Sequence, residues 1–327
     1  MRRSRILAYA GRRLLQAVPL ILAVAVLNFL LLQIAPGDAA EVLAGEAGTA
    51  TPEYMARLRE EFGLDQPMHV QLWNMLLRLL QLDLGHSFRH GVPVLELILD
   101  RLPATLLLML TTLGVSVLFG VLLGTLAARG ANGVVDAIIS VGAMIAYATP
   151  VFWIGLMMIV LFSVELRWLP SGGMTTITGD REGLALVADI AWHMILPVTT
   201  MSFFFIAIYC RIMRASVLNV MEEDYVTTAR AKGLSELAIL PRHTMRNALL
   251  PIVTLAGLHL STLLGGSVLI ETVFAWPGLG RLTFDAVFQR DLNLLLGILF
   301  VCSVLVVLMN LLVDLLYFWI DPRIEVD

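Results

Sequence analysis

Residues 219–251 read NVMEEDYVTTARAKGLSELAILPRHTMRNALLP, a polar island in an otherwise apolar chain. The first part of this stretch predicts one short helix. Asn219 is a preferred capping residue, and Gly233 ends the helix because glycine adopts positive φ without steric cost. The charged residues follow the helix dipole, with anions at the start and cations near the end: Glu222, Glu223 and Asp224, then Arg230 and Lys232.

One face of the predicted helix is suited to contact with another protein. Tyr225, Ala229 and Lys232 recur at helical spacing and therefore share this face. Thr228, Ala229 and Ala231 are small, so another protein can approach the backbone closely. We interpret the stretch as a helix held by a partner. The alternative is a solvated cytoplasmic loop, which charged segments between membrane helices usually form.

The composition of the whole chain predicts an all-α polytopic membrane protein. Of its 327 residues 58% are hydrophobic and only 15% are charged, and a soluble chain of this length could not bury so much apolar surface. The net charge of −4 gives no support to nucleic-acid binding. Cys210 and Cys302 both fall in predicted membrane spans, where a disulfide framework or zinc site is not expected.

Six apolar stretches are long enough to cross a bilayer. The first follows five arginines near the N-terminus and is longer than the apolar region of a signal peptide, so it is predicted to be a span with a cytoplasmic N-terminus. Arginines gather on the side where the N-terminus lies, which places both termini in the cytoplasm. The predicted spans are 14–35, 102–128, 134–164, 192–214, 252–273 and 292–320.

A long polar segment, 36–100, is predicted to lie on the extracytoplasmic side between the first two spans. It holds a helix that begins at Pro52 and ends at Gly63, and an amphipathic helix over 68–82. Arg78 argues against a span here, because a charge at the bilayer centre costs about 3 kcal/mol. The amphipathic helix is expected to lie on the membrane surface or pack on the protein core.

Prolines and polar residues interrupt the apolar spans. Pro103 is predicted in the first turn of the second span, and Pro150 and Pro197 inside the third and fourth are expected to give plain kinks. Four polar residues at depth could line a pathway or join helices: Asn28, His259, Asn310 and Asp314.

Several energy-coupling and catalytic motifs are absent. Lys232 is the only lysine and is followed by Gly233, so no Gly-Lys-Ser/Thr P-loop can bind ATP in this chain. His-Glu-x-x-His and Gly-x-Ser-x-Gly are also missing, which argues against a protease or hydrolase. We therefore expect a non-enzymatic subunit with no cofactor or metal of its own and with chemistry supplied by a partner.

Three motifs stand out in the central polar stretch: Asp224-Tyr225-Val226, Thr228-Ala229-Arg230-Ala231-Lys232-Gly233 and Arg246-Asn247-Ala248-Leu249-Leu250-Pro251. A later motif contains Glu271, Phe274, Trp276, Pro277, Gly278, Gly280 and Arg281, and shorter ones lie at 35–38, 63–67, 83–87 and 321–323. Together these motifs resemble the permeases of binding-protein-dependent ABC importers of the dipeptide and oligopeptide group, in which the central stretch is the cytoplasmic coupling loop and the motif from Glu271 to Arg281 is extracytoplasmic. In the wider importer loop pattern, Thr227, Thr228, Ala229 and Gly233 fit, whereas His243, Thr244, Met245 and Arg246 do not.

The resemblance implies a type I ABC importer transmembrane fold in a bacterial inner membrane, and the long outer segment resembles the first of two permease subunits. It implies a second homologous permease, two cytoplasmic ATPases that carry ATP and Mg²⁺, and an extracytoplasmic solute-binding protein. Residues 1–100 are expected to form an anchor helix and outer segment, 101–320 the transmembrane core with the coupling loop 219–251, and 321–327 a cytoplasmic tail.

The expected cargo is a di- or oligopeptide, with nickel chelates, glutathione or another peptide-like solute as the alternative. The sequence identifies no substrate-binding residue. A secondary transporter would show paired internal repeats and buried acids, and no convincing repeat is present. A scaffolding membrane protein would leave residues 219–251 without a role.

Overall fold

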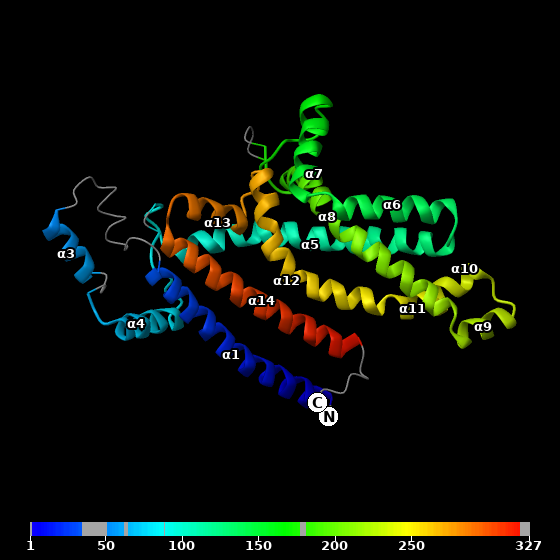
Figure 1. Ribbon diagram of the computed structural model, residues 1–327, viewed down its shortest axis with the longest axis horizontal. Coiled ribbons are helices and arrows are strands. Elements are labelled where there is room, and N and C mark those ends of the chain that lie inside the picture. Colours follow the sequence, from blue (N-terminus) through cyan, green and yellow to red (C-terminus); the bar gives the residue numbers. More distant parts are fainter. Residues whose placement is uncertain (1, 35–50, 62–64, 88, 177–180, 321–327) are drawn as a thin grey trace. The chain divides into compact units, whose positions relative to one another are not determined.

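The computed structural model describes residues 2–34, 51–61, 65–87, 89–176 and 181–320. Within these ranges the regular elements are helices, apart from one isolated bridge between His86 and Pro93. The first part of the chain holds α1 (Arg2–Ile34), α3 (Pro52–Glu61), α4 (Met68–Leu80) and α5 (Val94–Arg129) (Figure 1).

The next elements are α6 (Val134–Ala148), α7 (Val151–Met158), the π-helix η1 (Ile159–Glu165) and α8 (Leu184–Met221). The polar stretch 219–251 contains α9 (Asp224–Ala231), α10 (Glu236–Ile239), η2 (Leu240–Thr244) and α11 (Met245–Ala248). The chain continues through α12 (Leu250–Val273), α13 (Leu279–Phe288) and α14 (Leu292–Ile320).

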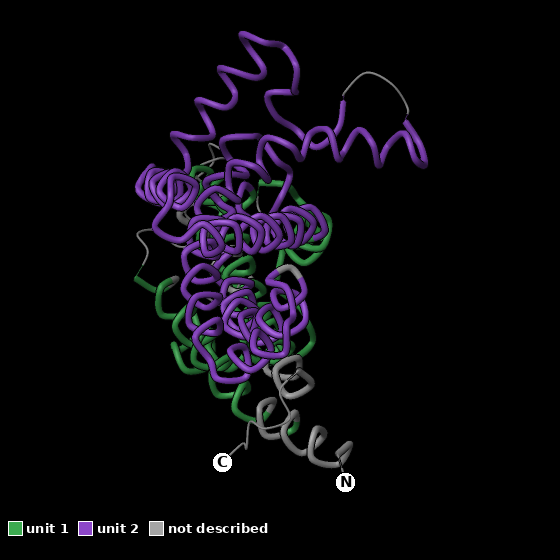
Figure 2. Tube along the Cα trace, turned by 90° about the vertical axis from the view of Figure 1, so that its right-hand side faces the viewer, with its two compact units in different colours: residues 1–102, 282–327 green, residues 103–281 purple. Residues whose placement is uncertain are grey.

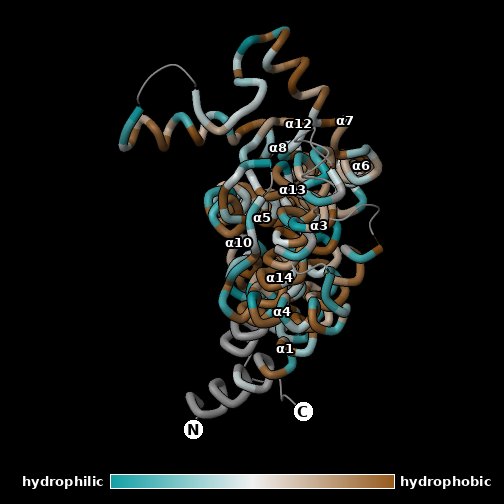
Figure 3. Tube along the Cα trace, turned by 90° about the vertical axis from the view of Figure 1, so that its left-hand side faces the viewer, coloured by the Kyte–Doolittle hydropathy of each residue, from teal (hydrophilic) through white to brown (hydrophobic). Residues whose placement is uncertain are grey.

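The chain divides into two compact units, which Figure 2 colours separately. Unit 1 comprises residues 1–102 and 282–327, and unit 2 comprises residues 103–281. Hydrophobic residues run along the helices of both units, as Figure 3 shows. The expected division of the chain into 1–100, 101–320 and 321–327 stays a prediction.

In unit 1, α1 lies beside α14 (Figure 1). The buried amide of Asn28 donates to the backbone oxygen of Leu296 over 3.5 Å, so this deep polar residue joins two helices. Helix α4 contacts α1, where the Gln33 amide donates to Gln71 Oε1 over 3.0 Å. The Thr51 hydroxyl accepts from the Tyr54 N–H at the start of α3, as expected for a helix that begins at Pro52.

The apolar stripe of α4 is exposed. Trp73, Leu77 and Leu80 lie one turn apart, and Leu80 is 81% exposed. This exposure favours the first of the two predicted positions of α4, on a membrane surface.

In unit 2, α8 contacts α6, α7 and α12. Gly120 and Gly124 of α5 lie one turn apart against α8, and a Cβ at Gly120 would come within 2.3 Å of Tyr209 Cβ. This small-residue spacing permits close helix packing in membranes, and it was missed by the sequence analysis. Tyr209 is fully buried, and its hydroxyl lies 3.0 Å from His259 Nδ1.

The prediction of a plain kink at Pro150 was wrong. The chain bends by 102° between 134–148 and 151–165, with Pro150 as the N-cap of α7. Thr149 is extended, as expected for the residue before proline, so the helical path breaks there. Pro103 is not in a first turn, because α5 already begins at Val94. Helix α8, by contrast, runs unbroken through Pro197.

Three described helices are individually long and apolar enough to span a membrane, or four if the bent pair counts as one span. The described apolar parts of α1 and α12, 15–31 and 250–260, are shorter. The count of six spans therefore stays a prediction. The side chain of Asp314 lies outside the described residues.

Candidate functional site

Helix α9 is the short helix that residues 219–233 predict, with a different start. Helix α8 continues to Met221, so Asn219 lies inside α8 and the prediction that it caps the short helix was wrong. Glu222 is the C-cap of α8, and Glu223 is the N-cap of α9. Asp224 alone stands in the first turn of α9, where an anion complements the helix dipole.

The end of α9 confirms the prediction for Gly233. This residue has φ +83°, its N–H donates to the Arg230 oxygen over 2.9 Å, and the Leu234 N–H donates to the Ala229 oxygen over 3.3 Å. These two bonds form the Schellman arrangement that closes a helix with a left-handed glycine. The next segment is thereby turned back toward α9.

Ala229 does not lie on a free face. It is 5% exposed and packs with Val226 and Ile239 in a small apolar core under α9. The predicted partner-facing set of Tyr225, Ala229 and Lys232 was therefore wrong about Ala229. The loop folds back through α10, and Ile239 occupies the space that an ATPase was expected to fill.

The outward face of α9 is instead formed by Asp224, Thr228 and Ala231, which lie at helical spacing and are all exposed. The Thr228 hydroxyl donates to the Asp224 backbone oxygen over 2.9 Å, so its polar group is already satisfied. Small, satisfied side chains leave this face open to close approach by another surface.

An exposed ion pair fixes α9 to α10. The Arg230 guanidinium donates from Nε to Glu236 Oε1 over 2.6 Å and from Nη1 to the Met221 oxygen over 3.4 Å. The hydrogen bond from Arg230 lowers the pKa of the Glu236 carboxyl, and the same bond raises the pKa of Arg230. Both side chains are more than a third exposed, so water screens the attraction.

The second half of the loop is tied to the first. The Asn247 amide donates to the Tyr225 hydroxyl over 2.7 Å, and Ala248 is fully buried. Lys232 and Arg246 are exposed. The loop is therefore a folded cap at the ends of α8 and α12.

The motif Glu271–Arg281 forms a buried lock. The Glu271 carboxylate accepts from the Thr105 hydroxyl over 2.8 Å and from the Arg281 N–H over 3.0 Å. Trp276 is fully buried and donates from Nε1 to the Ala104 oxygen over 2.9 Å. Thr105 also accepts from the Leu279 N–H over 2.7 Å. The motif thus joins the end of α12 to α5.

Close packing explains two glycines of this motif. A Cβ at Gly278 would lie 2.4 Å from Glu271 Cδ, and one at Gly280 would lie 2.6 Å from Val268 Cα. Phe274 is buried as well, and its oxygen accepts from the Gly173 N–H over 2.8 Å. Pro277 and Arg281 are partly exposed.

A partly buried ion pair joins α6 to α8. Arg214 donates from Nε and Nη2 to the two oxygens of Asp136, each over 2.6 Å, and Asp136 is 5% exposed. The Asn132 N–H and the Ser140 hydroxyl also donate to this carboxylate. Sequence reasoning missed the pair, because no spacing rule links residues so far apart.

The motif 83–87 also has a structural role. Ser87 is 1% exposed and donates to Asp291 Oδ2 over 2.5 Å, and Gly85 has φ +78°. The matching residues 35–38, 63–64 and 321–323 lie outside the described ranges. Among the described residues, no three His, Cys, Asp or Glu side chains gather closely enough to hold a metal ion.

Two family descriptions match the chain. The family "Binding-protein-dependent transport system inner membrane component" matches residues 120–326, and the N-terminal part of such membrane components matches residues 6–109. The matches together include both α9 and the buried lock.

Curated relatives extend over nearly the whole chain. A putative peptide transport system permease protein of Brucella abortus is 40% identical, covering 97% of this chain and 98% of the relative. A probable peptide ABC transporter permease protein of Sinorhizobium fredii is 44% identical over 97% of this chain and 99% of the relative. The oligopeptide transport system permease protein AppB of Bacillus subtilis is 39% identical over 97% and 99%.

The fold has a solved counterpart. A chain of the inward-facing MetNI methionine ABC transporter superposes with a TM-score of 0.56 at 17% identity, covering 69% of this chain and 97% of that one. This likeness shows that the chain has the fold of an ABC transporter membrane subunit. Its sequence, its apolar helices and this fold together show that the protein belongs to the family of binding-protein-dependent transport system inner membrane components, as a multi-pass membrane permease.

Proposed function

We propose that this chain is one of two homologous permeases of an ATP-driven importer, and that together they form a path for di- or oligopeptides. The cargo follows from the relatives, whose names specify peptide or oligopeptide transport. Nickel chelates and glutathione are not favoured by any of these names. A solute-binding protein delivers the peptide and sets the selectivity.

The single observation that supports coupling is the form of α9. This short helix lies in the loop between the long apolar helices α8 and α12. Val226 and Ala229 pack against Ile239 on its inner side, and Asp224, Thr228 and Ala231 are exposed on its outer side. A rigid helix with a small-residue face is suited to docking in a groove of a partner ATPase. ATP and Mg²⁺ bind to that partner, and this chain has no ATPase activity.

Docking must carry enough free energy to switch the transporter. Moving a two-state equilibrium from 1:99 to 99:1 requires about 5.5 kcal/mol of differential interaction. One exposed contact supplies much less, so helix and groove must move together. The bonds from Arg230 to α10 and from Asn247 to Tyr225 make the whole loop a candidate rigid body.

The proposed topology has six spans, both termini in the cytoplasm of a bacterium and α4 on the outer surface of the inner membrane. Reporter fusions after Met75 and after Trp168 should both be extracytoplasmic, and a cytoplasmic signal from either would contradict the topology.

Reconstitution tests the function. The chain, its second permease and the two ATPases are reconstituted in liposomes, with the extracytoplasmic side facing the external solution. The binding protein and a labelled dipeptide are added outside, and uptake of the dipeptide is measured. Uptake should require both ATP and the binding protein. Uptake of metal chelates but of no peptide would overturn the cargo, and peptide uptake by this chain without ATP would overturn the mechanism.

A further inference from the structure

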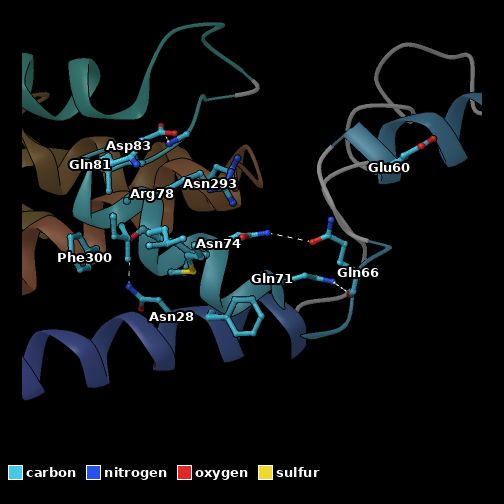
Figure 4. A pocket seen from close by; sticks show the side chains of 18 residues that line it. Asn28, Glu60, Gln66, Gln71, Asn74, Arg78, Gln81, Asp83, Asn293 and Phe300 are labelled. Atoms are coloured by element: carbon cyan, nitrogen blue, oxygen red, sulfur yellow. Dashed lines mark hydrogen bonds between the residues drawn. The ribbon is translucent and has the colours of Figure 1, made fainter. Parts of the chain in front are cut away.

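A cavity of about 560 Å³ lies within unit 1. It is lined by α1, the end of α3, Gln66, α4, the turn after α4 and the start of α14. Figure 4 shows the side chains of Asn28, Asn74, Arg78 and Asn293 around it. Its volume is within the range of about 300–1,000 Å³ that is typical of small-molecule sites.

The lining is rich in carboxamides with unused acceptor oxygens. Asn28, Asn74 and Asn293 each donate one bond within the chain, to Leu296, Gln66 and His86 respectively. In the described part of the chain, their side-chain oxygens accept no hydrogen bond. A carboxamide oxygen has two lone pairs, so these three residues can accept from N–H donors of a ligand.

Charges of both signs complete the lining. The Arg78 guanidinium has no hydrogen bond or ion pair with another described side chain and is exposed. Asp83 uses one oxygen to accept from the Gly85 N–H over 2.9 Å, and its second oxygen accepts nothing from the described residues. Guanidinium groups bind carboxylates by paired N–H donors, and carboxylates bind ammonium groups.

The rest of the lining is mixed. Glu60, Gln66, Gln71 and Gln81 add polar groups, and Phe29, Met75, Leu296 and Phe300 add an apolar surface. Such a surface accommodates hydrocarbon side chains, and it adds no charge preference.

We infer that this cavity binds a short zwitterionic peptide, with Arg78 at the ligand's carboxylate and the carboxamide oxygens and Asp83 at its ammonium and backbone N–H groups. The inference deepens the proposed function, on which it rests for the extracytoplasmic position of the cavity. A phospholipid head group is the competing occupant, but the several amide acceptors match a peptide's repeated N–H donors better than one ammonium.

Binding of radiolabelled trialanine to the full-length chain in nanodiscs tests the site. Arg78→Gln should weaken binding by about ten- to a hundredfold, the loss expected for a charge-assisted hydrogen bond. Trialanine amide, which lacks the carboxylate, should bind the wild type as weakly as trialanine binds the variant. Arg57→Gln is the matched control, because Arg57 is exposed on α3 and does not line the cavity.

Three outcomes would overturn the inference: no saturable trialanine binding, equal binding of trialanine and its amide, or normal binding by Arg78→Gln. Lipid analysis of the same nanodiscs covers the competitor. If the wild type retains phosphatidylethanolamine, Arg78→Gln loses it and neither protein binds trialanine, the cavity is a lipid site and the inference is overturned. If the chain binds trialanine as expected but the complete importer takes up no peptide, the proposed function fails and the inference stands.

Discussion

Gly278→Ala perturbs the buried lock at its tightest point. The added Cβ would lie 2.4 Å from Glu271 Cδ and 2.5 Å from Thr105 Oγ1, whereas ordinary contacts begin at 3.4 Å. Glu271 or Thr105 must therefore move by about 1 Å. Either movement breaks the 2.8 Å bond between them, and movement of Thr105 also releases the Leu279 N–H.

The expected destabilisation has two parts. Overpacking of a tight interior costs about 1–3 kcal/mol, and each lost hydrogen bond costs about 0.5–1.5 kcal/mol. The free energy of unfolding should fall by about 1.5–6 kcal/mol in total, the lower limit for one lost hydrogen bond and the upper limit for two. The buried carboxylate of Glu271 then loses one of its donors, which raises the cost toward the upper end.

Thermal unfolding of the purified chain in nanodiscs, followed by tryptophan fluorescence, measures this effect. Gly142→Ala is the matched control, because nothing lies within 4 Å of an added Cβ there and alanine is favoured over glycine in a helix by about 1 kcal/mol. Gly278→Ala should melt below the wild type and Gly142→Ala should not. A melting temperature of Gly278→Ala equal to the wild type would refute the reasoning.

Three further predictions concern other contacts. Asp136→Asn leaves Arg214 without its charge partner and should destabilise the chain by about 1.5–3 kcal/mol in chemical unfolding, the range for a charge-assisted hydrogen bond, because Arg214 is partly exposed to water; an unchanged midpoint would contradict a structural role for the pair. Because Arg230 lowers the pKa of Glu236, their bond stabilises the loop above the ordinary carboxyl pKa of 4.5 and is lost as pH falls through the lowered pKa. The protection factors of the α9 and α10 amides, which correct hydrogen-exchange rates for the intrinsic slowing of exchange in acid, should therefore fall below pH 4.5, and Glu236→Gln should remove that dependence. Gly120→Leu should prevent close packing of α5 on α8 and yield aggregated protein in size-exclusion chromatography, since even a Cβ would meet Tyr209 Cβ at 2.3 Å; a monodisperse variant would contradict the close approach.

Local rules predicted the parts of the molecule that depend on local physics. Gly233 was correctly expected to end a helix, since few residues other than glycine adopt the left-handed conformation that closes a helix. Apolar runs likewise predicted where the long helices lie. The family and its fold could be inferred because the motifs span nearly the whole sequence.

Contacts between distant residues could not be predicted in this way. Ala229 has the spacing of a surface residue, and only the return of Ile239 buries it. Thr105 and Glu271 are 166 positions apart, and Asp136 and Arg214 are 78 apart, so periodicity carries no information about either pair. The size of the 102° bend at Pro150 could not be predicted either, because a proline in an apolar run is compatible with a small kink as well as with a break.

The central claim is that α9 transmits ATPase movement to this chain through its exposed face. Ala231→Glu places a charge on that face, and Ala131→Glu places the same charge in the exposed turn after α5 as a control. A charge buried without a partner at an interface costs several kcal/mol. In proteoliposomes containing the complete importer, ATP-dependent dipeptide uptake should fall to background in Ala231→Glu and persist in Ala131→Glu, with both variants inserted normally. Wild-type uptake in Ala231→Glu would contradict the claim.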